Sequence, residues 1–375
     1  MLGIDAPSCP TASIPDLAAE IYFVSDLRGC VARLSSEDGS VMSPTEIERG
    51  VGALAALPNI RGLALVDPAE IPEVVRLSGI RFLSIFRNAI GPPLSMQEVH
   101  RMQELEHLRI SHHGPCPLDD LTQLAGLRAL SLSNLRCSNL DALRGLRNLR
   151  RLDIIKGEVT DFSAVDELSG LVELNVIRSG WSGFGARTPN LRVLRVHPGV
   201  ETPGVYMFED YDCPAVFDLQ ELRQQKNVEE LWLQCTSRAI HTDALTDMRQ
   251  LWRLSLDSSR ALPESGRFLA LEDLAIYRME HRLSKAQRRT LRRSSRIRRI
   301  ALPEHGVELM LDTLSKMRGL RTVVVLSPEP SLAEQRLSDR VRSSCPGITF
   351  EYRYRLDRRD SFSTFSWMDD DVYGL

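Results

Sequence analysis

The chain repeats a short hydrophobic motif, apolar-x-x-apolar-x-apolar, separated by longer stretches in which apolar residues recur at every third position. The first apolar residues of successive motifs are Ile60, Ile80, Leu105, Leu127, Leu149, Leu171, Leu191, Val228, Leu251, Leu271, Ile297, Leu320 and Cys345. Most steps between them are 20 to 26 residues long, but the step from Leu191 to Val228 spans 37. The chain therefore consists mainly of internal repeats, about 13 in number.

The register of the motif is sustained between Leu118 and Val176, where eighteen consecutive template positions are apolar. Within each motif the last two apolar residues alternate with period 2, which predicts a short strand with two inward side chains. Between strands, the spacing of three seen in Leu140, Leu143 and Leu146 is typical of a tight 3₁₀ or helical arc with one inward face.

Neither piece of a repeat can bury its apolar side alone, so successive repeats must stack to form one continuous core. The pattern predicts an α/β fold: a curved solenoid with a parallel β-sheet on its concave face and 3₁₀ or short helical arcs on its convex face.

Over residues 60–350 the chain resembles leucine-rich repeat proteins, most closely the 22-residue repeats of bacterial internalins and of phosphatase-regulatory proteins. That family usually places Asn three residues after the last strand anchor, where it bonds backbone groups of the turn. Here only Asn88 matches, and positions such as Ser179 and Thr236 hold other residues. The resemblance implies recognition of a protein partner through the concave face.

Three segments are expected along the chain: an N-terminal cap at 1–59, the solenoid at 60–356 and a flexible acidic tail at 357–375. Within the cap, 21–24 predicts a strand, and Ser43-Pro44-Thr45-Glu46 predicts the start of a helix whose apolar face is Ile47, Val51, Leu54 and Leu57. The 37-residue step predicts an insertion at about 199–216, and insertions in solenoids form loops on one rim.

Composition and charge limit the classes of function and the cellular locations that we expect. Charged residues make up 26% of the chain, and its formal charge of −3 makes nucleic-acid binding unlikely as the main role. Arg outnumbers Lys by 43 to 4, which is typical of a GC-rich, bacterial genome. Neither a membrane span nor a secretory signal is evident. The seven cysteines are odd in number and include no C-x-x-C pair, so we expect no disulfide framework and a cytoplasmic location. We also expect a monomer.

The sequence offers little catalytic chemistry. No zinc-protease, P-loop, nucleophile-elbow or kinase motif occurs, and His112 and His113 should point to opposite faces of a strand. Cys345 and Cys137 occupy expected core positions, and no Cys begins the Cys-x-Asp motif of bacterial leucine-rich repeat ubiquitin ligases. We therefore expect no enzymatic activity, no cofactor and no metal.

The segment 278–299 is strongly basic, with ten Lys or Arg residues and one acid. Such a strip on a convex helix is most often a solvated face whose Arg stems cover apolar atoms. The alternative is an anion-binding or nucleic-acid-binding surface, although no aromatic residues interleave with the charges.

The strand residues between the anchors should face outward on the concave sheet, and several of them are of types that dominate protein interfaces. The candidate protein-binding residues are Arg109, Arg151, Asp153, Glu173, Arg195, Glu230, Trp232, Arg253, Asp257, Asp273 and Tyr277, with Tyr206 and Tyr211 in the insertion. The leading hypothesis is a non-enzymatic recognition module with an immunity or regulatory role in a bacterium. The alternatives are a translocated effector, acting as an adaptor or atypical ubiquitin ligase, and an anion binder using 278–299.

Overall fold

The structure is a computed structural model. It describes residues 17–24, 29–36, 40–57, 59–68, 77, 79–87, 99–114, 118–137, 139–157, 159, 161–179, 188–198, 216–279, 281–327 and 334–354. The chain divides into two compact units: unit 1 is Met1–Asn190 with Val200–Met207, and unit 2 is Leu191–Gly199 with Phe208–Leu375. The expected tail at 357–375, and all of the expected insertion except Val216, lie outside the described residues.

Unit 1 is built on a sheet whose strands follow one another in chain order. The strands are β1 (Leu17–Val24), β2 (Gly29–Ser36), β3 (Ile60–Val66), β4 (Phe82–Arg87), β5 (His107–Gly114), β6 (Ala129–Leu135), β7 (Arg151–Ile155) and β8 (Glu173–Ser179). Strands β1 and β2 pair antiparallel, and from β2 to β8 each strand pairs parallel with the next. The repeats therefore begin on a hairpin, of which the sequence analysis found only the first strand.

The sheet of unit 2 continues the same pattern with an interruption. Its strands are β9 (Val193–Pro198), β11 (Glu230–Leu233), β13 (Arg253–Ser258), β14 (Asp273–Arg278), β15 (Arg299–Pro303), β16 (Thr322–Ser327) and β17 (Thr349–Tyr354), all parallel. Strand β9 pairs directly with β11 across the 37-residue step. The short strands β10 (Phe217–Asp218) and β12 (Ala239–Ile240) form a separate pair beside the main sheet.

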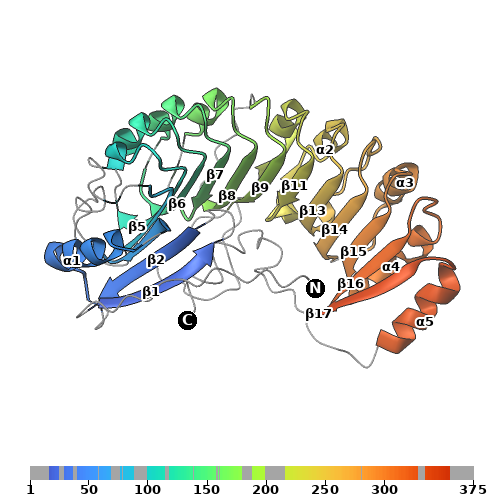
Figure 1. Ribbon diagram of the computed structural model, residues 1–375. Helices are drawn as coiled ribbons and strands as arrows, with labels where there is room; N and C mark the ends of the chain where they lie inside the picture. Colours follow the sequence, from blue (N-terminus) through green and yellow to red (C-terminus); the bar gives the residue numbers. More distant parts are fainter. Residues whose placement is uncertain are drawn as a thin grey trace. The chain divides into compact units, whose positions relative to one another are not determined.

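The connections between strands contain the expected arcs. In unit 1 these are α1 (Pro44–Ala55) and the 3₁₀ helices Val99–Arg101, Leu118–Gln123, Asp141–Gly145 and Ser163–Glu167. In unit 2 they are the 3₁₀ helices Gln220–Gln224, Thr236–Arg238 and Ser259–Ala261, and the α-helices α2 (Ala244–Asp247), α3 (Lys285–Arg293), α4 (Glu304–Leu314) and α5 (Glu334–Ser344). Figure 1 shows α3 and α4 on one side of the sheet formed by β13 to β16.

Helix α1 forms as its cap sequence predicts. The Ser43 hydroxyl accepts a hydrogen bond from the Glu46 amide at 3.3 Å, and the Glu46 carboxylate accepts one from the Ser43 amide at 2.7 Å. Residues Ile47, Val51 and Leu54 form its buried face, whereas Leu57 lies beyond the end of the helix.

The repeat register of the sequence analysis is confirmed within each unit. In unit 1, Leu130 pairs with Leu152, and both side chains are fully buried. In unit 2, Leu254 pairs with Leu274 in the same way. These inward side chains form the core between the sheet and the arcs.

The last repeat departs from the predicted register. Phe350 pairs with Val323 and Tyr352 with Val325, so Phe350 and Tyr352 are its strand anchors, in place of Ile348 and Phe350. The prediction was wrong by two residues because helix α5 and its turn set where this strand begins, and the helix lacks the spacing of three.

Most turns lack the Asn that usually bonds their backbone groups, and side-chain hydroxyl and carboxylate groups form such bonds instead. The fully buried Ser179 hydroxyl accepts a hydrogen bond from the Gly157 amide at 3.0 Å. In unit 2, the Asp257 carboxylate accepts from the amides of Cys235, at 2.9 Å, and Thr236, at 2.8 Å. The Thr236 hydroxyl in turn accepts from the Ser258 amide at 3.1 Å.

Candidate functional site

Each sheet has an inner face, formed by the anchor residues, and an outer face formed by the side chains between them. Residues paired across neighbouring strands form rows on the outer face. From β4 to β8 the middle row of unit 1 is Ser84, Arg109, Ser131, Asp153 and Asn175. From β9 to β16 the middle row of unit 2 is Arg195, Trp232, Ser255, Ala275, Ala301 and Val324. These rows contain four of the candidate residues.

The middle row of unit 1 contains a buried carboxylate, Asp153, which is 1% exposed. The Arg151 side chain donates from Nε to both Asp153 oxygens at 3.1 Å, and the Asn175 amide also donates to this carboxylate. Asn175 further donates to Glu173 Oε1 at 3.2 Å, and the nearest Arg151 and Glu173 charges lie 3.9 Å apart. The three candidates Arg151, Asp153 and Glu173 thus form one internally bonded cluster.

Burial raises the pKa of Asp153, because a charged carboxylate loses its hydration inside the protein. The Arg151 charge and the Asn175 hydrogen bond oppose this shift, and the Glu173 charge reinforces it. The hydrogen bonds from Arg151 and Asn175 and the burial of the carboxylate leave little of Asp153 for a partner to contact. Arg109, in the same row, is also buried.

The middle row of unit 2 begins with an aromatic–cation pair. Trp232 is half-buried on β11, and the guanidinium carbon of Arg195 on β9 lies 5.6 Å from the centre of its ring. The two residues are directly paired across the strands, which holds the indole against a cation that is itself buried. Such a pair contributes on the order of 1 kcal/mol and fixes the orientation of the ring.

A row of alternating charges runs beside Trp232. Glu230, Arg253, Asp273 and Arg299 pair across four neighbouring strands. Arg253 lies 3.4 Å from the Glu230 carboxylate and 3.5 Å from that of Asp273, which is also 3.5 Å from Arg299. We call these four residues the charged row; its charges sum to zero and hold one another in place.

Tyr277 lies on β14 at the edge of an apolar cluster. Ala301, Val324 and Leu326 form a small core of their own, and Ala275 and Tyr277 pack against it. Burial raises the pKa of the Tyr277 hydroxyl, and a hydrogen bond with Ser255 opposes the shift. The sequence analysis missed this cluster, although the unbroken apolar run Val323–Leu326 is typical of a strand buried on both faces.

The remaining candidates are placed differently. Asp257 lies on β13, and its carboxylate bonds two backbone amides of the turn that follows β11, so we assign it a structural role. Tyr206 and Tyr211 lie outside the described residues. The candidates that unit 2 brings together on one face are therefore Arg195, Glu230, Trp232, Arg253, Asp273 and Tyr277.

The basic segment 278–299 includes α3, whose Thr290 and Leu291 are buried. Arg292 lies 2.9 Å from the Asp312 carboxylate, and Arg298 lies 3.9 Å from Glu272. Arg289, Arg293 and Arg296 are exposed. Several of its charges are therefore balanced by acids of neighbouring repeats.

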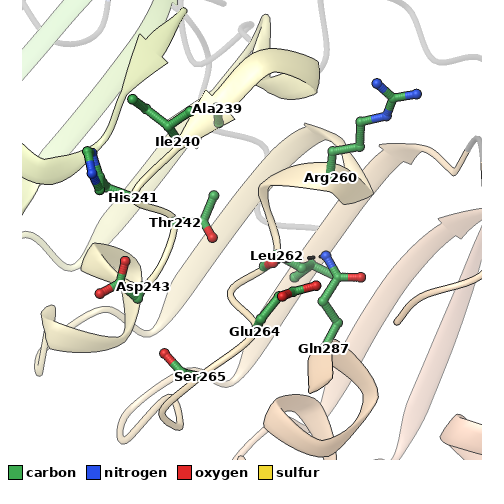
Figure 2. A pocket seen from close by; sticks show the side chains of 10 residues that line it. All are labelled: Ala239, Ile240, His241, Thr242, Asp243, Arg260, Leu262, Glu264, Ser265 and Gln287. Carbon is green, nitrogen blue, oxygen red and sulfur yellow. Dashed lines mark hydrogen bonds between the residues drawn. The ribbon is translucent and has the colours of Figure 1, made fainter. Parts of the chain in front are cut away.

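Unit 2 also has an open hollow of about 370 Å³ beside β12 and α3 (Figure 2). It is lined mainly by polar side chains, including His241, Asp243, Glu264 and Gln287. Gln287 donates to the Leu262 carbonyl at 3.0 Å, as the dashed line shows, and His241 lies 2.8 Å from Asp218. Across the described part of the chain, no three His, Cys, Asp or Glu side chains gather as a metal site.

The thiols offer weak nucleophiles. Burial raises the pKa of Cys137 to about 11 and also raises the pKa of Cys345, so both thiols stay protonated at neutral pH. Cys345 is buried as expected, whereas Cys137 is only half-buried.

Cys235 is disulfide-bonded, and its partner lies outside the described residues. The sequence analysis expected no disulfide framework and did not foresee this single bond, because spacing along the sequence does not reveal which cysteines the fold brings together. Disulfides are rare in the reducing cytoplasm, so this bond weakens the expectation of a cytoplasmic location that was based on the cysteines. None of the helices that the structure describes is long and apolar enough to cross a membrane.

No family model matches the chain, and no curated protein matches it either. Among solved structures it is similar to the internalin InlF of Listeria monocytogenes, with 15% identity, a TM-score of 0.49 and coverage of 86% of each chain. It is also similar to a leucine-rich repeat protein of Leptospira interrogans, with 16% identity, a TM-score of 0.43 and coverage of 83% of this chain and 81% of that one.

A further similar structure is the Toll–Spätzle complex of Drosophila, with 12% identity and a TM-score of 0.50. The match covers 92% of this chain but only 58% of that one. Identities this low compare folds alone. Together with the repeating strands, arcs and buried anchors, they show that the chain has the leucine-rich repeat fold.

Proposed function

We propose that the outer face of unit 2 binds a protein partner and that Trp232 is the centre of the binding surface. The observation that carries this proposal is a half-buried indole, held by a buried Arg195, on a sheet face. Trp, Tyr and Arg are the residue types that most often dominate protein interfaces. Holding the ring in advance lowers the entropy lost on binding.

The charged row supports the same proposal. Glu230, Arg253 and Asp273 flank the indole with polar groups that already hold one another in place, and an interface commonly surrounds an apolar centre with such a polar rim. Because these charges alternate, they would select a partner by the position of its charges more than by its net charge. The expected partner covers the indole with an apolar side chain and places polar groups opposite the charged row.

The proposed activity is recognition without catalysis. Protonated thiols and the open polar hollow supply no activated nucleophile in the described residues. One similar structure is the Toll–Spätzle complex, which accords with a leucine-rich repeat protein that binds another protein.

A more specific biological role is proposed from the sequence alone. The Arg-rich composition supports a bacterial origin, and with it an immunity or regulatory role as a monomer in the cytoplasm, or the alternative of a translocated effector. The disulfide at Cys235 argues for testing the effector first. Anion binding by the basic segment 278–299 has less support, because Arg292 and Arg298 lie beside acidic groups.

The test compares Trp232→Ala with Leu269→Ala, which removes another apolar side chain of unit 2 that is 40% exposed. Proteins captured from the native cell by the wild-type chain are identified, purified and titrated against both variants. We expect Trp232→Ala to weaken one partner by at least about 30-fold, or about 2 kcal/mol, and Leu269→Ala to leave its affinity unchanged.

Equal affinities of the wild type and Trp232→Ala, with both chains folded, would exclude this face as the binding surface. A partner lost only when Arg289 and Arg293 are replaced by Glu would instead assign binding to the basic segment.

A further inference from the structure

The turns that precede β13, β14, β15 and β16 form one rim of the sheet of unit 2, and each turn is hydrogen-bonded to the next. The Glu272 amide donates to the Trp252 carbonyl at 2.8 Å, and the Arg298 amide donates to the Glu272 carbonyl at 2.9 Å. The Arg321 amide then donates to the Arg298 carbonyl at 2.8 Å. These residues hold the same place in successive repeats, and we call this edge of unit 2 the entry rim.

The charge of the entry rim changes along the repeats. In the turns before β9 and β11, Arg192 lies 2.9 Å from Glu229, and Arg298 still lies 3.9 Å from Glu272. Lys316 likewise pairs with an acid of its own helix. Four further arginines are exposed, and none of them has an acidic side chain of the described residues within ion-pair distance. We call them the rim arginines: Arg293, Arg296, Arg318 and Arg321.

The two turns that carry the rim arginines are packed directly against each other. A Cβ atom at Gly319 would collide with the Ser295 carbonyl oxygen, so only glycine lets these turns approach so closely. Arg318 precedes Gly319 and Arg296 follows Ser295, so the close approach gathers cations from two repeats. Like charges brought together repel one another, and a bound anion would relieve that repulsion. The rim arginines therefore favour an anionic ligand.

The rim arginines differ from the charged row in how they are held. Arg253 in the charged row contacts the carboxylates of Glu230 and Asp273 at 3.4 and 3.5 Å, which fixes its position. The rim arginines lack such contacts, so each of them would lose rotamer freedom on binding a rigid partner. A ligand whose charges can rearrange around the arginines does not require that loss. The headgroups of a lipid bilayer have this property, because lipids diffuse within the layer.

An exposed leucine lies beside the rim arginines. The Phe268 amide donates to the Ser294 hydroxyl at 3.0 Å, which aligns the turn before β14 with the turn before β15 and places Leu269 beside Ser295. Leu269 is 40% exposed. An apolar side chain at the edge of a cationic surface can enter the boundary between headgroups and acyl chains. It would give a nucleic acid neither a hydrogen bond nor a stacking contact, so it favours a lipid ligand.

We propose that the entry rim of unit 2 binds the surface of an anionic lipid bilayer. The rim arginines contact the phosphates and carboxylates of the headgroups, and Leu269 inserts between them. Clusters of about four to eight Lys or Arg residues bind such surfaces, and the guanidinium fork matches phosphate oxygens. Arg318 and Arg321 lie outside the basic segment 278–299, so this site is assembled by the fold from two repeats. It lies at the edge of the sheet, apart from the outer face that carries Trp232, and does not depend on the proposed function.

The first experiment is co-sedimentation of the full chain with lipid vesicles in about 0.1 M salt. Vesicles of phosphatidylcholine with about 30% phosphatidylserine are compared with vesicles of phosphatidylcholine alone. We expect the chain to partition onto the anionic vesicles at least about tenfold more strongly, because each cation near such a surface contributes separately. Raising the salt to about 1 M should remove the difference, since the Debye length then falls to about 3 Å.

The second experiment compares two double variants with the same change of charge. Arg296→Glu with Arg321→Glu alters the entry rim. Arg238→Glu with Arg282→Glu alters exposed arginines of unit 2 that follow β11 and β14, at the opposite rim. The first pair should weaken partition onto the anionic vesicles at least about tenfold, and the control pair less than about twofold. Both should unfold at the wild-type temperature, because all four side chains are exposed.

Leu269→Ala should weaken partition onto the anionic vesicles about threefold and leave the affinity for a protein partner unchanged. Equal partition of the two double variants, with both chains folded, would overturn the proposal. An RNA duplex that binds the wild type but not the entry-rim variant, with vesicle binding unchanged, would also overturn it and assign the rim to nucleic acid. If the vesicles bind as expected and Trp232→Ala binds every partner normally, the proposed function fails and the membrane contact stands.

Discussion

The middle rows of the two units have the same place in the repeat but opposite chemistry. In unit 1 the row is polar, and Asp153 and Asn175 satisfy one another together with Arg151. In unit 2 the row passes from Arg195 and Trp232 through small residues to Val324. The inner anchors are leucines, or residues like them, in both units. The inner face thus specifies the fold, while the outer face is free to become either a structural network or a contact surface.

The largest effect should come from the inner face, equally in both units. Leu152→Ala in unit 1 and Leu254→Ala in unit 2 each remove a fully buried side chain. Each should lower the free energy of unfolding by about 2–5 kcal/mol, because a cavity remains. Chemical denaturation measures both. A loss below about 1 kcal/mol at either site would contradict the shared register.

The next effect should be confined to unit 1. Arg151→Ala leaves the Asp153 carboxylate buried without its cation, and this should cost about 3 kcal/mol at pH 7. Burial has already raised the pKa of Asp153, and losing Arg151 raises it further, so the folded state takes up a proton first as the pH falls. The cost should therefore shrink towards pH 4.

Asp153→Asn is the matched control for Arg151→Ala. It keeps an oxygen that accepts from Asn175 and removes the charge, so we expect a change below about 1 kcal/mol. The double variant should recover most of the stability lost in Arg151→Ala. A constant loss across the pH range would show that Arg151 acts through packing alone.

Trp232→Ala should sharpen the contrast between the two middle rows. Because the indole is half-buried on an outer face, its removal leaves no closed cavity, and we expect a loss of about 1 kcal/mol or less. Thermal and chemical denaturation of this variant beside Arg151→Ala gives the comparison directly. A loss as large as that of Leu254→Ala would make Trp232 a core residue and move the binding surface elsewhere.

The charged row should contribute less than the Asp153 cluster. Arg253→Gln removes contacts to Glu230 and Asp273 at 3.4 and 3.5 Å between partly exposed groups. We expect a loss of about 0.5–1 kcal/mol in 0.1 M salt and a smaller loss in 1 M salt, because salt screens such pairs. A loss that does not depend on salt would point to the stacking of Arg253 on Trp252, 4.8 Å away, as the larger contribution.

A modest pH effect should arise in unit 1 from His112. The side chain is fully buried on β5, and its pKa is lowered by burial and then by the charges of Arg87 and His113. The unfolded chain is protonated first as the pH falls, so the free energy of unfolding should decrease below about pH 6.5. His112→Phe should remove this slope in urea titrations at pH 5.5 and 7.5, whereas His113→Phe should keep it.

The fold could be predicted from the sequence because its signal is local and repeated. Leu130, Leu152 and Leu174 recur at a fixed spacing, and each occurrence reinforces the strand position of the others. Helix α1 was predicted from four adjacent residues that form its cap. The prediction failed in the last repeat, where the spacing of three gives way to helix α5 and moves the anchors to Phe350 and Tyr352.

The site could be predicted only in part, because its properties depend on neighbours in other repeats. Position in the strand identified Trp232 and Asp153 equally well as outer residues. What separates them is the neighbouring side chains. Arg151 on the same strand and Asn175 on the next strand both bond Asp153, whereas the neighbour of Trp232 on β13 is the small Ser255. The turn role of Asp257 was likewise hidden, since its hydrogen-bond donors lie about one repeat away in the sequence.

The turns give the stack of repeats a direction. The Ser179 hydroxyl bonds the amide of Gly157 in the preceding repeat, and the Asp257 carboxylate does the same for Cys235 and Thr236. Asn148 and Asn190 also donate to carbonyls of the preceding repeat, those of Ala125 and Ser169. Each repeat is therefore completed by the one that follows it. Shortening the chain from its C-terminal side therefore removes the side chains that hold these turn amides, and the amides of the last repeat kept lose their acceptors. Backbone bonds between repeats, such as that from the Arg128 amide to the Glu106 carbonyl, are broken by shortening from either side.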